Sequence, residues 1–352
     1  MKQAHRILWP RGNFTRIFTL LFFFLAGCAT PRQCLISSER KGTLGYEATV
    51  VDRGQSYSVW RDRLVQRMQY DFGVYGLNKV TKDSTFTWGY PETVEGHDDG
   101  VVKRRLSIKS LLDNQTIPIL VLSSKTTPSD DRVDVVLVIH GHHESIDDVT
   151  SMKSQMRGLG LRLARAGFVV VVPELRSFGE FRIDGKGHNA YIRKKPDGKF
   201  VGEVVADMVS VAEFVKQYYT NLHTLNVVGH SLGGYIALHF SALDPDINRT
   251  VVSGMFFPYT CLNSNYHHAC QHFKQFEEAA EFSDVAGLIA PRKLMIHFGK
   301  EDKYYTPAVD SLFHNAQQIY KDNNARDSIV LSVNPDKKHE VNPDTVIPFL
   351  RD

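Results

Sequence analysis

The sequence predicts an α/β fold in which a mostly parallel central sheet carries helices on both faces. Residues 135–139 (VVLVI) form an uninterrupted run of β-branched and aliphatic residues, which is typical of a strand buried on both faces. From there to the C-terminus, strand-like and helix-like segments alternate, and this favours parallel strands joined by helices. The length of 352 residues and the ordinary composition exclude a wholly disordered, collagen-like or coiled-coil chain.

The expected elements follow in order along the chain. Apolar runs and turn residues predict strands at 105–110, 117–123, 135–139, 168–172, 225–228, 250–253, 293–298 and 328–333. Helices are expected at 149–166, at 202–219, from 232 onward and at 308–320. Asp113-Asn114 joins the first two strands as a hairpin, Gly167 ends the first helix, and Pro173 ends the fourth strand. The stretch Phe256–Phe282 interrupts the alternation and is expected to form a small cap insertion.

The N-terminus is expected to be a signal peptide over residues 1–27. A basic segment precedes eleven mostly apolar residues, 17–27, which are too few to span a bilayer but suit a signal-peptide core of about 7–15 residues. The net charge of 42 − 39 = +3 comes from this segment, which holds four basic residues and no acidic one. The remainder carries 38 − 39 = −1, so no nucleic-acid partner is expected.

The junction Leu25-Ala26-Gly27-Cys28 resembles the lipobox of bacterial lipoproteins, in which lipid is attached to the cysteine before cleavage. The resemblance implies a lipid-anchored protein of the cell envelope, and Ala29 favours the outer membrane facing the periplasm. A plain secretory signal with an incidental Cys28 is the alternative. Residues 28–45 are then a tether, and 46–104 an aromatic-rich N-terminal extension ahead of the main domain at 105–352.

Export would place the other three cysteines in an oxidising compartment. Cys261 and Cys270 are close enough in sequence to close a short disulfide loop, which would leave Cys34 unpaired. Three free thiols are the alternative, because four cysteines in a chain of this length do not form a disulfide framework.

Gly229-His230-Ser231-Leu232-Gly233 lies between a β-branched strand and an apolar helix. This G-x-S-x-G context predicts a strained strand-to-helix turn that exposes the Ser231 hydroxyl as a nucleophile. A serine hydroxyl needs a base, and the base needs an orienting acid, which follow in the order serine, acid, histidine.

Asp302 is the expected acid, since it follows the strand at 293–298, with the adjacent Glu301 as the alternative. Only His314 and His339 come later in the chain. His314 falls inside a predicted helix, whereas His339 follows the last strand by a short polar loop. His339 is therefore the expected base.

The negatively charged oxygen formed during acyl transfer needs preorganised N–H donors. The backbone N–H of Leu232, at the start of its helix, is one expected donor. The loop after 135–139 reads His140-Gly141-His142-His143, and the backbone N–H of His142 is the second. No metal and no cofactor are expected, because the three histidines have no acid or cysteine companion at a metal-binding spacing; they are expected to line the mouth of the pocket.

With these residues in place, the chain resembles the α/β-hydrolases, and within them the dienelactone-hydrolase-like and acetyl-xylan-esterase-like group. The matching stretches are VVLVIHGHHES (135–145), ARAGFVVVVPELRSFGEFR (164–182), VVGHSLGGYIAL (227–238), DVAGLIAPRKLMIHFGKED (284–302) and KKHE (337–340). The resemblance implies Ser231, Asp302 and His339 as a catalytic triad. It also implies a structural Arg176 paired with a carboxylate or a carbonyl, and a His268/Cys270 pair. Dienelactone hydrolases proper use a cysteine nucleophile, so Ser231 favours ordinary ester cleavage.

The expected function is that of a serine esterase acting on a small-molecule or glycan ester through an acyl-enzyme. Two alternatives stay open: a non-catalytic, lipid-anchored protein on a hydrolase scaffold, and a peptidase of the prolyl-oligopeptidase type. The second would need a β-propeller of several hundred residues, and only about 100 residues precede the main domain.

Overall fold

The computed structural model describes residues 43–74, 93–98, 100–124, 132–193, 195, 199–262, 270–271 and 274–352. The chain divides into two compact units after Gln33, and every described residue belongs to the second unit. The expected signal peptide, the lipid attachment at Cys28 and most of the tether lie outside the described residues. Within the described part, no helix is both long enough and apolar enough to cross a membrane.

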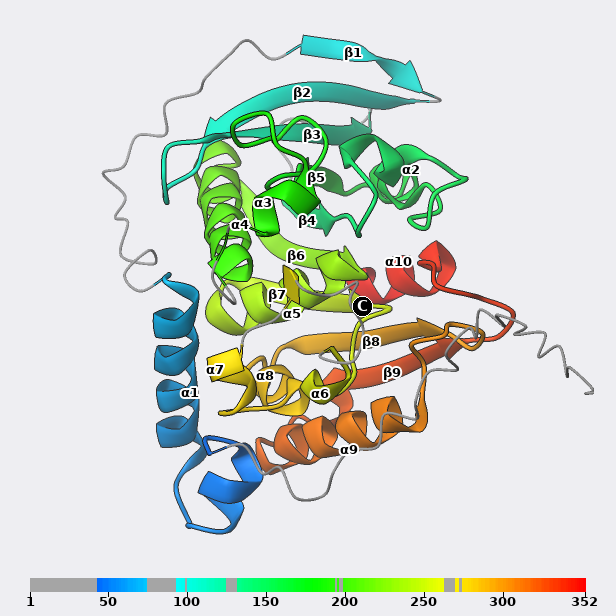
Figure 1. Ribbon diagram of the computed structural model, residues 1–352. Helices are drawn as coiled ribbons and strands as arrows, with labels where there is room; N and C mark the ends of the chain where they lie inside the picture. The colour runs from blue at the N-terminus through cyan, green and yellow to red at the C-terminus, as the bar shows by residue number, and fades with distance from the viewer. Residues whose placement is uncertain are drawn as a thin grey trace, which may run out of the picture. The chain divides into compact units, whose positions relative to one another are not determined.

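The described strands form one nine-stranded sheet in the order β1-β2-β3-β5-β4-β6-β7-β8-β9 (Figure 1). Pairing is antiparallel from β1 to β5 along this order and parallel from β5 to β9. The bounds are β1 Thr93–Asp98, β2 Val101–Lys109, β3 Thr116–Ser124, β4 Val133–Ile139, β5 Val169–Pro173, β6 Leu222–His230, β7 Ile247–Ser253, β8 Lys293–Gly299 and β9 Ile329–Asn334. The predicted mostly parallel sheet is confirmed, and β2 and β3 are the predicted hairpin.

Ten α-helices lie in the described residues. They are α1 Tyr57–Phe72, α2 Leu159–Arg165, α3 His188–Ile192, α4 Lys199–Tyr218, α5 Leu232–Leu243, α6 Tyr259–Leu262, α7 Lys274–Glu277, α8 Phe282–Gly287, α9 Pro307–Asp322 and α10 Pro343–Arg351. The short helices α6 and α7 occupy the stretch after β7 that the sequence assigned to a cap.

The helix predicted at 149–166 is much shorter than expected. A 3₁₀ turn covers Ile146–Thr150, and α2 begins only at Leu159. Between them Ser154 bonds the carbonyls of Asp148 and Ser151, and the backbone is left-handed at Arg157, with φ 51°. Serine side chains that bond nearby carbonyls, together with a positive φ, are incompatible with a continuous helix.

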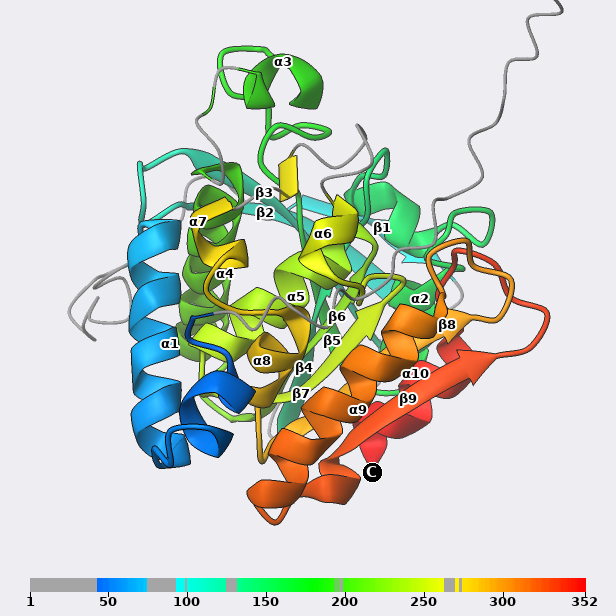
Figure 2. The same cartoon turned by 60° about the horizontal axis from the view of Figure 1, so that its bottom comes forward.

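Alternate residues of each parallel strand face opposite layers. In β4, Val135 and Leu137 belong to the core beneath α1, α4, α5, α8 and α9, whereas Val136 and Val138 belong to the core beneath α2 and α10. This two-sided burial is why the strand reads as a continuous apolar run. In Figure 2, α9 and α10 lie on opposite sides of β9, so the second unit has three layers with helices outside the sheet.

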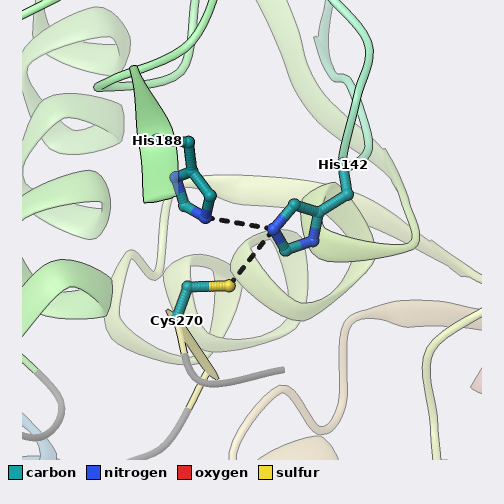
Figure 3. Close-up of side chains that lie close together, drawn as sticks. All are labelled: His142, His188 and Cys270. Carbon is teal, nitrogen blue, oxygen red and sulfur yellow. Dashed lines mark hydrogen bonds between the residues drawn. The ribbon is translucent and has the colours of Figure 1, made fainter. Parts of the chain in front are cut away.

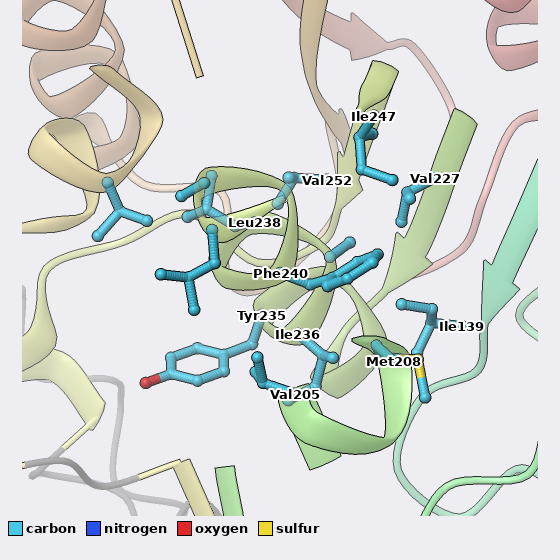
Figure 4. Packing of buried hydrophobic residues seen from close by; sticks show 14 of the residues in the cluster. Ile139, Val205, Met208, Val227, Tyr235, Ile236, Leu238, Phe240, Ile247 and Val252 are labelled. Atoms are coloured by element: carbon cyan, nitrogen blue, oxygen red, sulfur yellow. The ribbon is translucent and has the colours of Figure 1, made fainter. Parts of the chain in front are cut away.

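The larger core holds the helix that follows the expected nucleophile. Figure 4 shows Ile236 and Phe240 of α5 directed toward Ile139 and Val227 of the sheet, and all four side chains are fully buried. Burying one such side chain contributes about 1.5–3 kcal/mol, so this packing fixes the position of α5 over β4 and β6.

Helix α1 belongs to the same core, although it precedes the main domain in sequence. Trp60, Leu64, Met68 and Phe72 recur every four residues and are buried. A β-carbon at Gly202 of α4 would lie 1.9 Å from the carbonyl oxygen of Phe72, so glycine is needed where α1 meets α4. The described start of the N-terminal extension is therefore packed onto the layers of the main domain.

Candidate active site

Ser231 occupies the turn between β6 and α5. Its backbone has φ 55° and ψ −118°, a strained conformation for a residue other than glycine. A β-carbon at Gly229 would lie 2.0 Å from the carbonyl oxygen of Gly233, and one at Gly233 would lie 2.1 Å from that of Ile139. Both glycines of the motif are thus needed for the close approach of the turn to its neighbours.

Asp302 and His339 are in contact, although 37 residues separate them. The distance between His339 Nδ1 and Asp302 Oδ2 is 2.8 Å, and Asp302 is 4% exposed. The second carboxylate oxygen of Asp302 accepts a hydrogen bond of 2.9 Å from the backbone N–H of Tyr304. Glu301, the alternative acid, is exposed. The carboxylate behind His339 is therefore that of Asp302.

A tight turn returns the chain from β9 to the end of β8. A β-carbon at Gly299 would lie 2.2 Å from the carbonyl oxygen of Lys337 and 2.3 Å from that of Lys338. The absence of a side chain at Gly299 therefore lets the loop that carries His339 pass directly over the end of β8.

The imidazole of His339 lies next to the turn that carries Ser231. Its ring centroid is 4.5 Å from that of His230, the residue before Ser231. A β-carbon at Gly254, just after β7, would lie 2.8 Å from Cε1 of His339, while Ser231 N–H donates to the carbonyl of Ser253 at 2.8 Å. The structure thus brings Ser231, Asp302 and His339 to the same edge of the sheet, where the carboxyl ends of parallel strands meet.

A buried polar chain, which the sequence did not reveal, lies beneath these residues. His230 Nδ1 is 3.1 Å from Ser253 Oγ, and that oxygen is 2.9 Å from His297 Nδ1. The backbone N–H of Asn342 donates to His297 Nε2 at 3.4 Å, so the proton of His297 is assigned to Nδ1. Burial lowers the pKa of His297 to about 4, and burial also holds the pKa of His230 well below its usual value. Both rings are neutral at neutral pH.

The loop after β4 lies against Ser231. A β-carbon at Gly141 would lie 3.3 Å from Cβ of Ser231, and His142 comes next in the chain. The N–H of Gly141 donates to the buried carboxylate of Glu144 at 2.8 Å, and burial raises the pKa of that carboxyl. Leu232 is the first residue of α5, where a backbone N–H has no partner within its own helix. Both expected oxyanion donors therefore lie on segments adjoining Ser231.

The neighbouring histidines differ in their surroundings. His142 and His143 line a pocket, but Ser231 is not among the residues that line it, so their expected place at the mouth of the catalytic pocket stays a prediction. The expectation was wrong for His140, which is fully buried, with Nε2 2.8 Å from Oε1 of Glu174. His140 is the residue directly after β4, and its side chain joins the end of that strand to the end of β5. His314 is exposed on α9, in agreement with its assignment to a helix.

Arg176 is a structural residue, as expected. It is 1% exposed, and its guanidinium contacts Asp207 at 2.8 Å and Asp113 at 2.6 Å. Asp207 also accepts a 2.6 Å hydrogen bond from Ser110. These contacts join α4, the β2–β3 hairpin and the loop after β5, next to the wall of the pocket.

Replacing Arg176 with methionine should lower the free energy of unfolding by about 3–5 kcal/mol, because it leaves the fully buried Asp207 carboxylate without its partner. Urea denaturation of the purified protein measures this. Asp113→Asn is the matched control and should cost about 1 kcal/mol or less, because Asp113 is partly exposed and Arg176 keeps Asp207. Equal losses in the two variants would contradict the assignment.

A pocket of about 570 Å³ opens beside the loop after β4. It is lined by His142, His143, Glu144, Ser145, Asp148, Ser177, Phe178, Gly179, Arg182, Gly187, His188, Asn189, Ala190 and Arg193. Ser231 is not one of these lining residues. The loop after β4 thus contacts Ser231 near Gly141 and lines this pocket with His142 and the residues that follow it.

At the pocket, three side chains from distant segments meet (Figure 3). His142 Nε2 lies 3.0 Å from His188 Nε2 and 3.4 Å from Cys270 Sγ. Nδ1 of His188 is 2.9 Å from Ser177 Oγ, and the ring of Phe178 stacks on that of His188 at 4.2 Å. Burial lowers the pKa of His188 to about 4 and raises that of the Cys270 thiol to about 12. Sequence spacing gave no sign of this cluster.

Neither alternative for the cysteines holds, since Cys261 and Cys270 are not bridged to each other and the three thiols are not all free. Cys270 is a buried free thiol, whereas Cys261 is disulfide-bonded. The reason is local, because the side chain of Cys270 faces His142. The expected His268 partner of Cys270 lies outside the described residues.

The fold and the strand–serine–helix turn define the class of protein. The model of the alpha/beta hydrolase family matches residues 135–329, which is more than half of the chain. The chain therefore belongs to the alpha/beta hydrolase family. No curated protein matches the sequence.

Solved structures of esterases share the fold. Methylesterase BT1017 has a TM-score of 0.66 and 16% identity over 87% of this chain, although only 66% of that longer protein is covered. A glucuronoyl esterase from Solibacter usitatus has a TM-score of 0.60 and 12% identity, with 84% and 93% covered. Acetyl xylan esterase 1 from Thermoanaerobacterium sp. JW/SL YS485 has a TM-score of 0.54 and 15% identity, with 82% and 92% covered. At these identities the similarity is one of fold.

Proposed function

We propose that the protein is a serine esterase that cleaves carboxylic esters through an acyl-enzyme. The observation that carries the proposal is the 2.8 Å contact between Asp302 and His339 beside the strained Ser231 turn. With Asp302 accepting from Nδ1–H, the imidazole keeps its Nε2 lone pair, which is the tautomer that a general base requires. The neighbouring esterases lend support at the level of the fold.

In the proposed reaction, Ser231 Oγ attacks the ester carbonyl while His339 Nε2 removes the proton of the serine hydroxyl. Asp302 stabilises the resulting imidazolium, and the backbone N–H groups of Leu232 and His142 bind the oxyanion. His339 then gives the proton to the leaving alcohol. A water molecule, deprotonated by the same ring, attacks the acyl group and releases the acid, which restores Ser231.

The substrate is proposed to be a small-molecule or glycan ester. The similar structures are named as a methylesterase, an acetyl xylan esterase and a glucuronoyl esterase. Acetyl xylan, the substrate in the second name, is an ester of a glycan. We also propose, from residues 1–29 alone, that the mature protein is held at the bacterial envelope by lipid on Cys28.

Covalent labelling with a fluorophosphonate tests the function. The probe should abolish hydrolysis of 4-nitrophenyl acetate when one molecule of probe has reacted with each protein molecule. Peptide mass spectrometry should find the label on Ser231. Methyl and acetyl esters of polysaccharides, assayed in parallel, report the substrate class. Absence of both labelling and hydrolysis would favour a non-catalytic scaffold, whereas cleavage of peptides but not esters would favour a peptidase.

A further inference from the structure

We propose that His142, His188 and Cys270 form a binding site for a divalent transition-metal ion of the zinc type. None of the three belongs to the proposed triad, and His142 enters the proposed ester chemistry only through its backbone N–H, whereas the metal ligand is its side chain. The three ligand atoms lie within 4.8 Å of one another. Figure 3 shows the two imidazoles and the thiol directed toward a common point.

The distances are close to those of a tetrahedral site. Bond lengths of about 2.0–2.1 Å to nitrogen and about 2.3 Å to sulfur place two nitrogens ~3.3 Å apart and nitrogen and sulfur ~3.6 Å apart. The observed separations are 3.0 Å between the two Nε2 atoms and 3.4 Å between His142 Nε2 and Cys270 Sγ. These two pairs have to separate by only a few tenths of an ångström to admit an ion, and the third pair, His188 Nε2 and Cys270 Sγ, lies within 4.8 Å.

A cation suits the three facing atoms of the cluster better than a single hydrogen bond does. Nε2 of a histidine carries either one lone pair or one proton. In His142 this single atom faces both the Nε2 of His188 and the thiol of Cys270. One lone pair or one proton serves only one of these contacts well, whereas a cation at the centre accepts a lone pair from all three atoms.

The second layer of contacts also suits metal binding. Histidine ligands commonly donate their other ring N–H to a protein oxygen, which fixes the ring and its tautomer. The hydroxyl of Ser177 lies 2.9 Å from His188 Nδ1 and is 1% exposed, so it can accept that proton. Phe178 stacks on His188 and contacts His142 edge-on at 5.6 Å, which restricts both rings.

The ligand types select the metal. Two imidazoles and a thiolate favour zinc, cobalt or copper over magnesium or calcium, which prefer oxygen. Binding of M²⁺ would release the thiol proton of Cys270 to solvent and form a metal–thiolate bond, with no change in oxidation state. His142 and His188 line the 570 Å³ pocket, so a water molecule can supply the fourth ligand from that side.

Titration of the purified, metal-free protein with Co²⁺ and Zn²⁺ tests the site. The protein should bind one Co²⁺ with a thiolate-to-cobalt absorption band in the near ultraviolet, and Zn²⁺ should displace it and raise the melting temperature. Cys270→Ser should abolish the band, and His188→Ala should weaken binding at least 10-fold. Ser177→Ala, which removes only the second-layer oxygen, should weaken it about 10-fold.

His143→Asn is the matched control. His143 lines the same pocket and its ring is 5.5 Å from that of His142, but it is not among the three ligands. Its backbone φ is 63°, a conformation that asparagine tolerates. The affinity of the His143→Asn variant for Zn²⁺ should equal that of the parent protein. Absence of the band in the parent protein would overturn the proposal. So would an unchanged affinity for Zn²⁺ in the Cys270→Ser and His188→Ala variants, provided that both variants still unfold cooperatively.

Discussion

Replacing Ser231 with alanine should lower kcat for ester hydrolysis by about 10⁶-fold, because it removes the hydroxyl that is proposed to form the acyl-enzyme. The oxyanion donors remain, so a small residual rate over the uncatalysed reaction is expected. The substitution should leave the fold unchanged, since Ser231 is the residue between β6 and α5 and its side chain caps no helix N–H. Initial rates with 4-nitrophenyl acetate, together with loss of fluorophosphonate labelling, measure the effect.

Ser311→Ala is the matched control for this substitution. Ser311 is exposed on α9, and its hydroxyl only bonds the carbonyl of Pro307 one turn earlier. Its rate should equal that of the parent protein. If Ser231→Ala kept more than about a hundredth of the parental kcat, the serine would not be the nucleophile.

Much of the fold is readable from local sequence because its elements are locally determined. The β4 segment is buried on both faces, so every position is apolar and the strand stands out. The Ser231 turn is also local, since its two glycines are required by contacts that the turn itself makes. In such places, the local sequence pattern and the tertiary contacts require the same residue types.

Other features depend on contacts that no local pattern records. The choice between Asp302 and Glu301 rests on which carboxylate the tertiary fold buries, and adjacent residues look equivalent in sequence. The helix expected at 149–166 was interrupted by side-chain bonds of Ser154 to nearby carbonyls. Helix α1 had its apolar residues at regular spacing, yet its partner surface lies on α4 and α5, far along the chain.

The metal-binding candidate was the hardest feature to predict. His142 is 46 residues from His188 and 128 residues from Cys270, so the cluster has no motif. Its nearest sequence signal, the run His140-Gly141-His142-His143, was misleading, since His140 points into the core toward Glu174. His188 is the first residue of α3 and Cys270 lies between α6 and α7, so only tertiary packing brings them to His142.

Changing Asp302 to asparagine should lower kcat by about 10⁴-fold with little loss of stability. The backbone N–H of Tyr304 donates to Asp302 Oδ1, so the amide oxygen of asparagine will occupy that position. Its NH₂ group is then directed at Nδ1 of His339, which has to accept rather than donate. The imidazole proton moves to Nε2, and His339 can no longer remove the proton of Ser231. Steady-state kinetics measure kcat, and thermal unfolding checks the fold.

Glu301→Gln is the control, because it makes the same chemical change one residue earlier on an exposed side chain. Its kcat should stay within about twofold of the parent value, since surface carboxylates contribute little to a neighbouring buried pair. A larger loss in Glu301→Gln than in Asp302→Asn would reverse the assignment of the acid. The asymmetry between the two variants tests the tautomer directly, because both remove one negative charge while only Asp302→Asn reverses the hydrogen bond at His339 Nδ1.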